Sequence, residues 1–191
     1  MHPFISAQIA EERRARLRKE ADAARLAAAS STGRLHCRVL DPSDIDEIEA
    51  LFERLSWRSR YLRFMSPRNI TKSMLRYLAD VDHQRHEAVG AFEDRRLIGA
   101  AHYFRSQEDP TEAEIAAEIV DRYQRAGVGS CLLRELARLA RTRGITHFRA
   151  TTLAENRAAI GLLRSSGWPA VFRLDGPELA IRTTIEGSDA P

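Results

Sequence analysis

An alternating segment, a glycine-containing loop and an amphipathic helix follow one another between residues 111 and 143. In residues 111–120 apolar side chains recur at every second position, which predicts a strand with one face in the core. In residues 127–143 they recur at helical spacing, and Gly144 is a typical C-cap. A strand that passes through a short loop into such a helix buries both apolar surfaces together, so this unit predicts a sheet covered by helices.

The same periodicities indicate the other elements. Ser43 is the expected N-cap of a helix that continues to residue 55. The turn at residues 93–96 predicts a hairpin. Further helices are expected over residues 58–64, 71–79 and 156–166, and strands over residues 35–40, 88–92, 97–105, 147–153, 170–174 and 179–185. This order predicts an α+β fold with helices flanking a mixed central sheet of about six to seven strands.

Residues 1–33 differ in character from the rest of the chain. Residues 11–29 are rich in Ala, Arg and Glu, which favours helix, but they carry few large apolar side chains. Residues 30–33 (SSTG) resemble a linker. We expect a helical or partly disordered arm over residues 1–33, a compact domain over residues 34–187 and a disordered tail over residues 188–191. A solvated arm is favoured over one that binds a membrane or a partner.

Composition argues against several classes of protein. The net charge of +3 is too small to predict nucleic-acid binding. No apolar run could span a membrane and no signal-peptide core is present, so a cytoplasmic protein is expected. Cys37 and Cys131 belong to no Cys/His cluster, so they are expected to be buried reduced thiols, and no metal site is expected.

Residues 124–129 (QRAGVG) connect the strand to the helix. A helix N-terminus offers unpaired N–H groups, and glycines let a ligand approach the backbone, so this loop suits an anion such as pyrophosphate. A plain turn is the alternative. The loop is not a Walker loop, because no Gly-Lys-Ser/Thr follows. It is not a Rossmann fingerprint, because the third glycine is missing and the loop comes late in the chain.

Two motifs carry a family resemblance. Residues 124–129 have the form (Q/R)-x-x-G-x-(G/A), and residues 156–168 (NRAAIGLLRSSGW) are an Asn-led helix that ends in Gly-aromatic. These motifs and their spacing resemble those of the GNAT superfamily of acyl-CoA-dependent N-acetyltransferases, over about residues 35–185. The resemblance implies that acyl-CoA lies where two parallel central strands part, here residues 111–120 and 147–153.

The resemblance also implies which residues hold acetyl-CoA, the acyl donor. The backbone near the end of the strand would pair with the pantetheine arm, and the N–H groups of the loop would hold the pyrophosphate. Asn156 would hydrogen-bond the cofactor arm, and it can serve as a helix N-cap at the same time. The implied set is Ile119, Val120, Gln124, Arg125, Ala126, Gly127, Val128, Gly129, Ser130 and Asn156.

Acyl transfer to an amine needs a base, because a lysine ammonium with a pKa of about 10.4 is not a nucleophile. Glu112, Glu114 and Glu118 share the strand face opposite the apolar one. Periodicity does not choose among them, and a solvated strand face is the alternative.

A narrower resemblance, to bacterial Pat-type protein lysine acetyltransferases, is carried by residues 59–64 (SRYLRF), 82–83 and 113–116. It implies Glu114 as the general base and a protein lysine, for example on an acyl-CoA synthetase, as the acceptor. The alternatives are a small-molecule amine acetyltransferase and a non-catalytic acyl-CoA-binding domain. Many GNAT enzymes carry a Tyr acid where this chain has Leu163. His83 and His86 are expected to be surface loop residues.

Overall fold

The computed structural model describes residues 35–66 and 70–185, so the predicted arm at residues 1–33 and tail at residues 188–191 lie outside it. Seven strands form one sheet in the order β1-β2-β3-β4-β5-β7-β6. All neighbours are antiparallel except β4 and β5, which run parallel. The strands are β1 (Leu35–Val39), β2 (His86–Glu93), β3 (Arg96–Arg105), β4 (Glu112–Ile119), β5 (His147–Leu153), β6 (Ala170–Asp175) and β7 (Glu178–Thr184). The predicted mixed sheet is confirmed.

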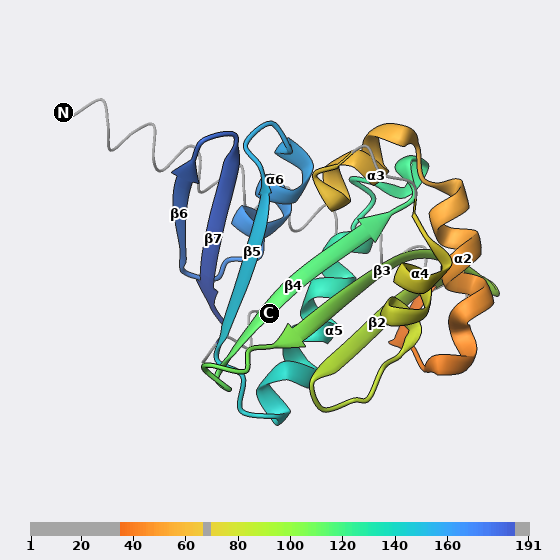
Figure 1. The fold of residues 1–191 in the computed structure, drawn as a ribbon, viewed down its shortest axis with the longest axis horizontal. Helices are drawn as coiled ribbons and strands as arrows, with labels where there is room; N and C mark the ends of the chain where they lie inside the picture. Colours follow the sequence, from red (N-terminus) through yellow and green to blue (C-terminus); the bar gives the residue numbers. More distant parts are fainter. Residues whose placement is uncertain (1–34, 67–69, 186–191) are drawn as a thin grey trace.

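Helices cover both faces of the sheet (Figure 1). The described helices are α2 (Ile45–Arg54), α3 (Trp57–Phe64), α4 (Lys72–Ala79), α5 (Val128–Thr142) and α6 (Arg157–Ser165), with 3₁₀ turns at Pro42–Asp44 and Asp121–Tyr123. On one face α5 buries Leu132 and Leu136 against the sheet, and α6 adds Leu163 to that core. On the other face α2 and α4 pack around Ile48 and Leu78.

The first 3₁₀ turn is capped two residues before the predicted position. The side chain of Asp41, rather than Ser43, accepts the hydrogen bond, at 2.8 Å from the backbone nitrogen of Ser43. Asp44 completes a capping box by accepting from the backbone nitrogen of Asp41 at 3.0 Å. Proline at position 42 fixes the turn, so the α-helix itself starts only at Ile45.

Both faces of β4 are covered by helices. Ala113 and Ile115 lie in the core beneath α5. On the opposite face, Glu118 and Val120 are 4% and 6% exposed, because α2, α3 and α4 lie over that face. A solvated strand face, the alternative left open by the alternation, is therefore wrong for Glu118. Alternation shows which face is the more apolar but not whether the polar face is also covered.

The sheet opens between its two parallel strands. β4 pairs with β3 along its whole length, but it pairs with β5 only at residues 112–114 and 147–149. Beyond that point β5 pairs with β7 alone. Figure 1 shows β4 and β5 diverging toward the end of the molecule where α3 and α6 lie. The separation leaves the backbone of β4 that faces β5 without a strand partner beyond residue 114.

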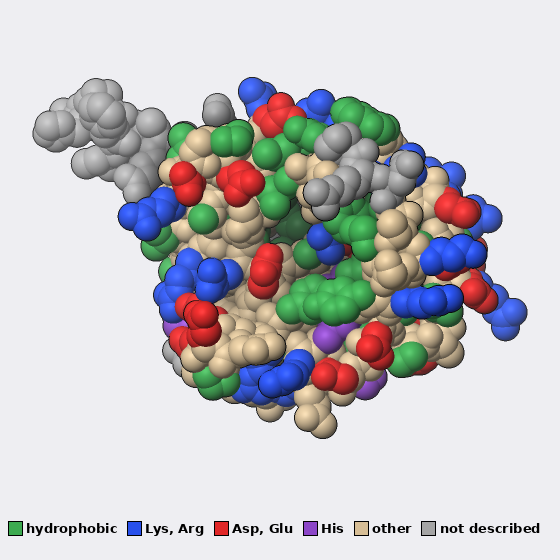
Figure 2. All heavy atoms as spheres, in the orientation of Figure 1, with side chains coloured by type: hydrophobic (Ala, Val, Ile, Leu, Met, Phe, Trp, Pro, Cys, Tyr) green, Lys and Arg blue, Asp and Glu red, His purple; other side chains and the backbone are tan. Residues whose placement is uncertain are grey.

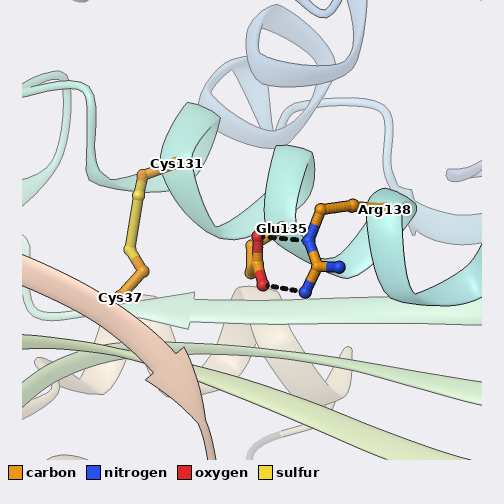
Figure 3. Close-up of a disulfide and its surroundings, with 4 residues drawn as sticks. All are labelled: Cys37, Cys131, Glu135 and Arg138. Carbon is orange, nitrogen blue, oxygen red and sulfur yellow. Dashed lines mark hydrogen bonds and ion pairs between the residues drawn. A yellow bond between two sulfur atoms is a disulfide. The ribbon is translucent and has the colours of Figure 1, made fainter. Parts of the chain in front are cut away.

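A disulfide between Cys37 and Cys131 joins β1 to the first turn of α5 (Figure 3). Both cysteines are half-buried at the edge of the α5-side core. The expectation of two buried reduced thiols is therefore wrong, because tertiary packing brings together two residues 94 positions apart. Further along α5, Glu135 and Arg138 form a bidentate ion pair, with the shorter contact at 2.6 Å.

Candidate active site

The loop between β4 and α5 contains two residues in the left-handed backbone region. Arg125 and Gly127 have positive φ angles of 60° and 87°, and Gly127 is the N-cap of α5, which begins one residue later than predicted. The first intrahelical bond found at this end runs from the backbone nitrogen of Cys131 to the carbonyl of Gly127, at 3.1 Å. The N–H groups of residues 128–130 precede it and have no intrahelical acceptor. Unpaired N–H groups at a helix N-terminus suit an anion.

The side chain of Gln124 turns inward and anchors this loop. Its Nε2 donates to the carbonyl of Ile119 at 3.0 Å and to Oγ of Ser59 at 3.2 Å. Asp121 accepts three hydrogen bonds from the start of α3, two from Ser56 and one from Ser59. Burial would raise the pKa of Asp121, but these hydrogen bonds outweigh it and lower the pKa. The loop is therefore tied to both β4 and α3.

Val120 has no free backbone group in the described structure. Its N–H donates to the carbonyl of Ile98 at 3.0 Å, and its carbonyl accepts from Tyr123 at 2.8 Å. Its side chain is buried in the core beneath α2 and α4. If Val120 contacts a cofactor as predicted, it would do so without a free backbone N–H group. Ile119, by contrast, is half-buried and lies in the part of β4 that has no β5 partner.

Close packing requires the second glycine of the loop motif. A Cβ at Gly129 would lie 2.9 Å from Cδ2 of Leu162 in α6 and 3.2 Å from Cδ1 of Ile119. The prediction attributed this glycine to ligand approach, and contact between α5 and α6 is a second reason for it. Asn156 caps α6 by accepting from the backbone nitrogen of Ala159 at 3.2 Å, which confirms its N-cap role.

The three glutamates on one face of β4 have different surroundings. Glu112 accepts from Nε of Arg182 at 2.6 Å and lies 3.6 Å from Arg149. Glu118 pairs with Arg63 at 2.8 Å and with His102 at 3.0 Å. Glu114 is exposed and has no hydrogen bond or ion pair with any residue in the described ranges. Of the three, only Glu114 presents a carboxylate that is free to take a proton from an incoming group.

Sequence reasoning missed a buried polar cluster on this face. Its members are Arg63 from α3, Glu118 from β4, His102 from β3 and His86 from β2, and the last three are 0–6% exposed. His86 was expected in a surface loop, but β2 begins at that residue and α4 covers it, so that expectation is wrong. A signal was available, since His102 interrupts an apolar strand on the face it shares with Glu118.

The charges in this cluster set its protonation. Burial by itself would raise the pKa of the Glu118 carboxyl, but the charges and hydrogen bonds of Arg63 and His102 outweigh it and lower the pKa. Burial lowers the pKa of His86, and the charge of His102 adds to that effect. Glu118 is thus ionised and His86 neutral near neutral pH.

A pocket of about 360 Å³ opens beside this cluster, between α3, α4 and β3. Figure 2 shows the hollow near the centre of this face, with hydrophobic and basic side chains around it. Phe104, which lines the pocket, lies directly opposite Glu114 in the β3–β4 ladder, so Glu114 neighbours one wall of the pocket. The lining residues are Arg63, Phe64, Ser73, Met74, Tyr77, Leu78 and Phe104.

Three further observations concern an acid, a metal and a membrane span. Leu163, the position where related helices carry a tyrosine acid, is 6% exposed and packs in the core beneath α5. Within residues 35–66 and 70–185, no group of three or more His, Cys, Asp or Glu side chains is placed to hold a metal ion. In the same ranges no helix is long and apolar enough to cross a membrane.

Comparison with known proteins gives a family match and named relatives. Residues 49–168 match the profile of the Acetyltransferase (GNAT) family. Acetyltransferase Pat from Mycolicibacterium smegmatis is 31% identical over 125 residues, which cover 64% of this chain and 38% of that one. Acetyltransferase PA5475 from Pseudomonas aeruginosa is 30% identical over 136 residues, which cover 69% and 73%. The match thus spans well under half the length of the first relative.

Solved structures share the fold. The GNAT domain of S. lividans PAT superposes with a TM-score of 0.72 at 24% identity, over 78% of this chain and 90% of that one. The cAMP-binding acyltransferase from Mycobacterium smegmatis gives 0.56 at 28% identity, over 82% and 45%. The acetyltransferase yncA from Salmonella typhimurium, solved with its cofactor acetyl-CoA, gives 0.65 at 18% identity, over 83% and 98%.

Proposed function

Because this chain belongs to the acetyltransferase (GNAT) family, we propose that it transfers an acetyl group from acetyl-CoA to the side-chain amine of a protein lysine. The observation that carries the proposal is one juxtaposition. The sheet parts between β4 and β5 beyond residue 114, β4 continues into the loop at the start of α5, and Glu114 stands where the two strands part, with no side-chain partner among the described residues. A donor in the gap would present its thioester beside Glu114.

The chain's own groups suit the binding of acetyl-CoA. The backbone of β4 up to Ile119 would pair with the pantetheine arm, in the place that β5 leaves open. The N–H groups of residues 124–130 would hold the pyrophosphate, with Arg125 adding positive charge. Asn156 would contact the arm through the donor capacity of its amide that remains after it caps α6. A metal is not part of this scheme.

Glu114 would act as the general base. Its carboxylate takes one proton from the lysine ammonium, and the neutral amine attacks the thioester carbonyl carbon. The new C–N bond forms as the C–S bond breaks, and CoA leaves as a thiolate. The attacking nitrogen gives up its second proton, which reaches the thiolate through water, because Leu163 offers no acid. Glu112 and Glu118 are less suited, since each is already neutralised by cationic partners.

The named relatives support a protein lysine as the acceptor. Two similar proteins carry the name Pat, one of them at 31% identity. The pocket beside Glu114 has aromatic walls from Tyr77 and Phe104, which suit the aliphatic stem of a lysine. A small amine in the same pocket is the second candidate, since 360 Å³ would hold one entirely.

One experiment separates these candidates. Release of CoA from acetyl-CoA is measured against a panel of acyl-CoA synthetases and a panel of polyamines, amino acids and amine antibiotics. Turnover with a synthetase, with the acetyl group on one lysine by mass spectrometry, supports the proposal. Turnover confined to small amines would mean that the acceptor is a small amine and not a protein lysine. Tight acetyl-CoA binding without turnover on either panel means a non-catalytic acyl-CoA-binding domain.

We also propose that residues 34–187 act as a catalytic domain in the cytoplasm without the arm at residues 1–33. Deletion of the arm should leave acetyl-CoA binding unchanged by calorimetry, and a truncated chain that aggregates contradicts this. The Cys37–Cys131 disulfide is unusual for that compartment. Cell fractionation tests the location: recovery of the chain in the cytoplasmic fraction supports the proposal, and recovery outside that fraction contradicts it.

A further inference from the structure

The buried cluster of Arg63, Glu118, His102 and His86 forms a continuous hydrogen-bonded chain that the proposed chemistry does not use. Nε of Arg63 lies 2.8 Å from Oε2 of Glu118, and Oε1 of Glu118 lies 3.0 Å from Nε2 of His102. Nδ1 of His102 lies 3.1 Å from Nε2 of His86, and Nδ1 of His86 lies 3.0 Å from the carbonyl oxygen of Asp80. We call these four side chains the buried array.

Counting protons along the array gives the state of His102. The carbonyl of Asp80 can only accept, so Nδ1 of His86 carries a proton. His86 is neutral because burial lowers its pKa, so its Nε2 is bare and accepts from Nδ1 of His102. Glu118 is an ionised carboxylate and also only accepts. Nε2 of His102 must therefore carry a second proton.

We propose that His102 is a buried imidazolium, and that the buried array is a positioning device that holds a net positive charge in the wall of the acceptor pocket. Arg63 and His102 contribute two positive charges and Glu118 one negative charge, which leaves one positive charge. Arg63 carries that charge to the pocket, because it lines the pocket while its Nε is fixed from behind by Glu118. The consequence for catalysis rests on the proposed function.

A positive charge beside the pocket would assist an amine acceptor. Like charges disfavour each other, so the array would favour the neutral, nucleophilic form of a bound amine. The array lies on the same face of β4 as Glu114, separated from it by Ala116. Glu114 would take the proton, and the array would make the ammonium easier to deprotonate. In this scheme Glu118, His102 and His86 are positioning residues.

The surroundings of the array are mostly apolar or aromatic. Rings of Phe104 and His86 stack at 4.3 Å between centroids, and Tyr77 stacks on Phe104 at 5.4 Å. The charged groups that act on His86 from outside the array are the carboxylates of Asp82 and Glu87. Glu87 is engaged elsewhere, by Arg143 at 3.0 Å and His83 at 2.9 Å. From α4, the titratable group that faces the array is the phenol of Tyr77.

Nitrogen NMR of the full chain labelled at histidine tests the protonation directly. An imidazolium shows two protonated ring nitrogens, whereas a neutral ring shows one bare nitrogen at a clearly different shift. Signals of His102 are assigned by their loss in His102→Gln, and His36→Gln on exposed β1 is the matched control. We expect both ring nitrogens of His102 to carry a proton at neutral pH. A bare ring nitrogen on His102 at about pH 7 overturns the proposal.

A kinetic measurement tests the effect on the acceptor, with acetyl-CoA as donor and poly-L-lysine and cadaverine as amine probes. His102→Gln keeps hydrogen-bonding groups but removes the charge. At about pH 7 and saturating amine we expect kcat to fall about tenfold, one unit of ionisation of the bound amine, with the KM for acetyl-CoA unchanged. The loss should disappear near about pH 10, where the free amine is already half neutral.

Three outcomes of the kinetics decide the matter. A loss that disappears at high pH supports the positioning role, and His36→Gln should then match the unaltered chain. An equal loss at every pH, or a raised KM for acetyl-CoA, indicates a purely structural array and overturns it. If the unaltered chain acetylates neither probe, amine transfer in the proposed function fails for these acceptors, while the NMR result still decides the state of His102.

Discussion

Replacing Glu114 by glutamine is the sharpest test of the proposed chemistry. The change keeps the shape and hydrogen-bonding capacity of the side chain, but it removes the ability to take a proton. Glu114 is exposed and unpaired among the described residues, so its replacement breaks no contact. Stability should therefore change by less than about 0.5 kcal/mol, as is usual for surface substitutions.

The expected loss of activity is large by comparison. A positioned general base contributes about 10²–10⁴-fold, which corresponds to about 2.7–5.4 kcal/mol of transition-state stabilisation. Acetyl-CoA should bind the variant as tightly as before, because the loop and the β4 backbone that would hold it are unchanged. The signature is thus a loss of kcat with the binding constant and the melting temperature intact.

Two neighbouring glutamates supply matched controls on the same strand face. Glu112→Gln weakens a half-exposed contact with Arg182 and should leave kcat within about twofold. Glu118→Gln leaves Arg63 and His102 without their buried anion, so it should cost about 3–5 kcal/mol of unfolding free energy.

Three assays measure these effects. Release of free CoA with the acceptor found on the panels gives kcat, calorimetry with CoA gives the binding constant, and thermal unfolding gives the melting temperature. If Glu114→Gln keeps kcat within about twofold of the unaltered chain, Glu114 is not the base. If Glu112→Gln instead shows the large loss, the choice among the three carboxylates was wrong.

Three other predictions concern stability. Burial lowers the pKa of His86, so the unfolded chain binds a proton at this residue more readily than the folded chain does. The contribution of His86 to stability is therefore full above about pH 6.5 and is lost as pH falls below that value. Between about pH 7 and about pH 5, the melting temperature of His86→Gln should fall less than that of the unaltered chain. Equal slopes for the two proteins refute this linkage. Reduction of the Cys37–Cys131 disulfide, which closes a 94-residue separation, should cost up to about 4.7 kcal/mol, and Cys37→Ser should remove all sensitivity to reductant. A reductant that leaves the unaltered chain's unfolding curve in place contradicts the bridge. Gly129→Ala would place a Cβ 2.9 Å from Cδ2 of Leu162 in α6, so it should lower the free energy of unfolding by about 1–3 kcal/mol. Gly161→Ala has open space around the new Cβ and should raise that free energy by up to about 1 kcal/mol. Equal effects of the two changes in denaturant titration would show that α5 and α6 can separate freely.

Local patterns predicted most of the elements of the fold. The alternation of residues 111–120 and the helical spacing of residues 128–142 arise from interactions within one segment, so one sequence suffices to read them. The end of a helix and its cap depend on residues within about four positions, which is why Asn156 was correctly assigned as an N-cap. The match of two motifs to one family then predicted that the sheet parts between two parallel central strands.

The sequence by itself determined the elements, the loop at the start of α5 and the three carboxylates on one strand face. Only the tertiary structure decided what surrounds those carboxylates, because burial and charge depend on segments far apart in the chain. Arg63 and His102 reach Glu118 from α3 and β3, and no spacing along β4 predicts them. Tertiary packing also moves His86 from an expected surface loop into the core and joins Cys37 to Cys131. It leaves the carboxylate of Glu114 without a partner among the described residues.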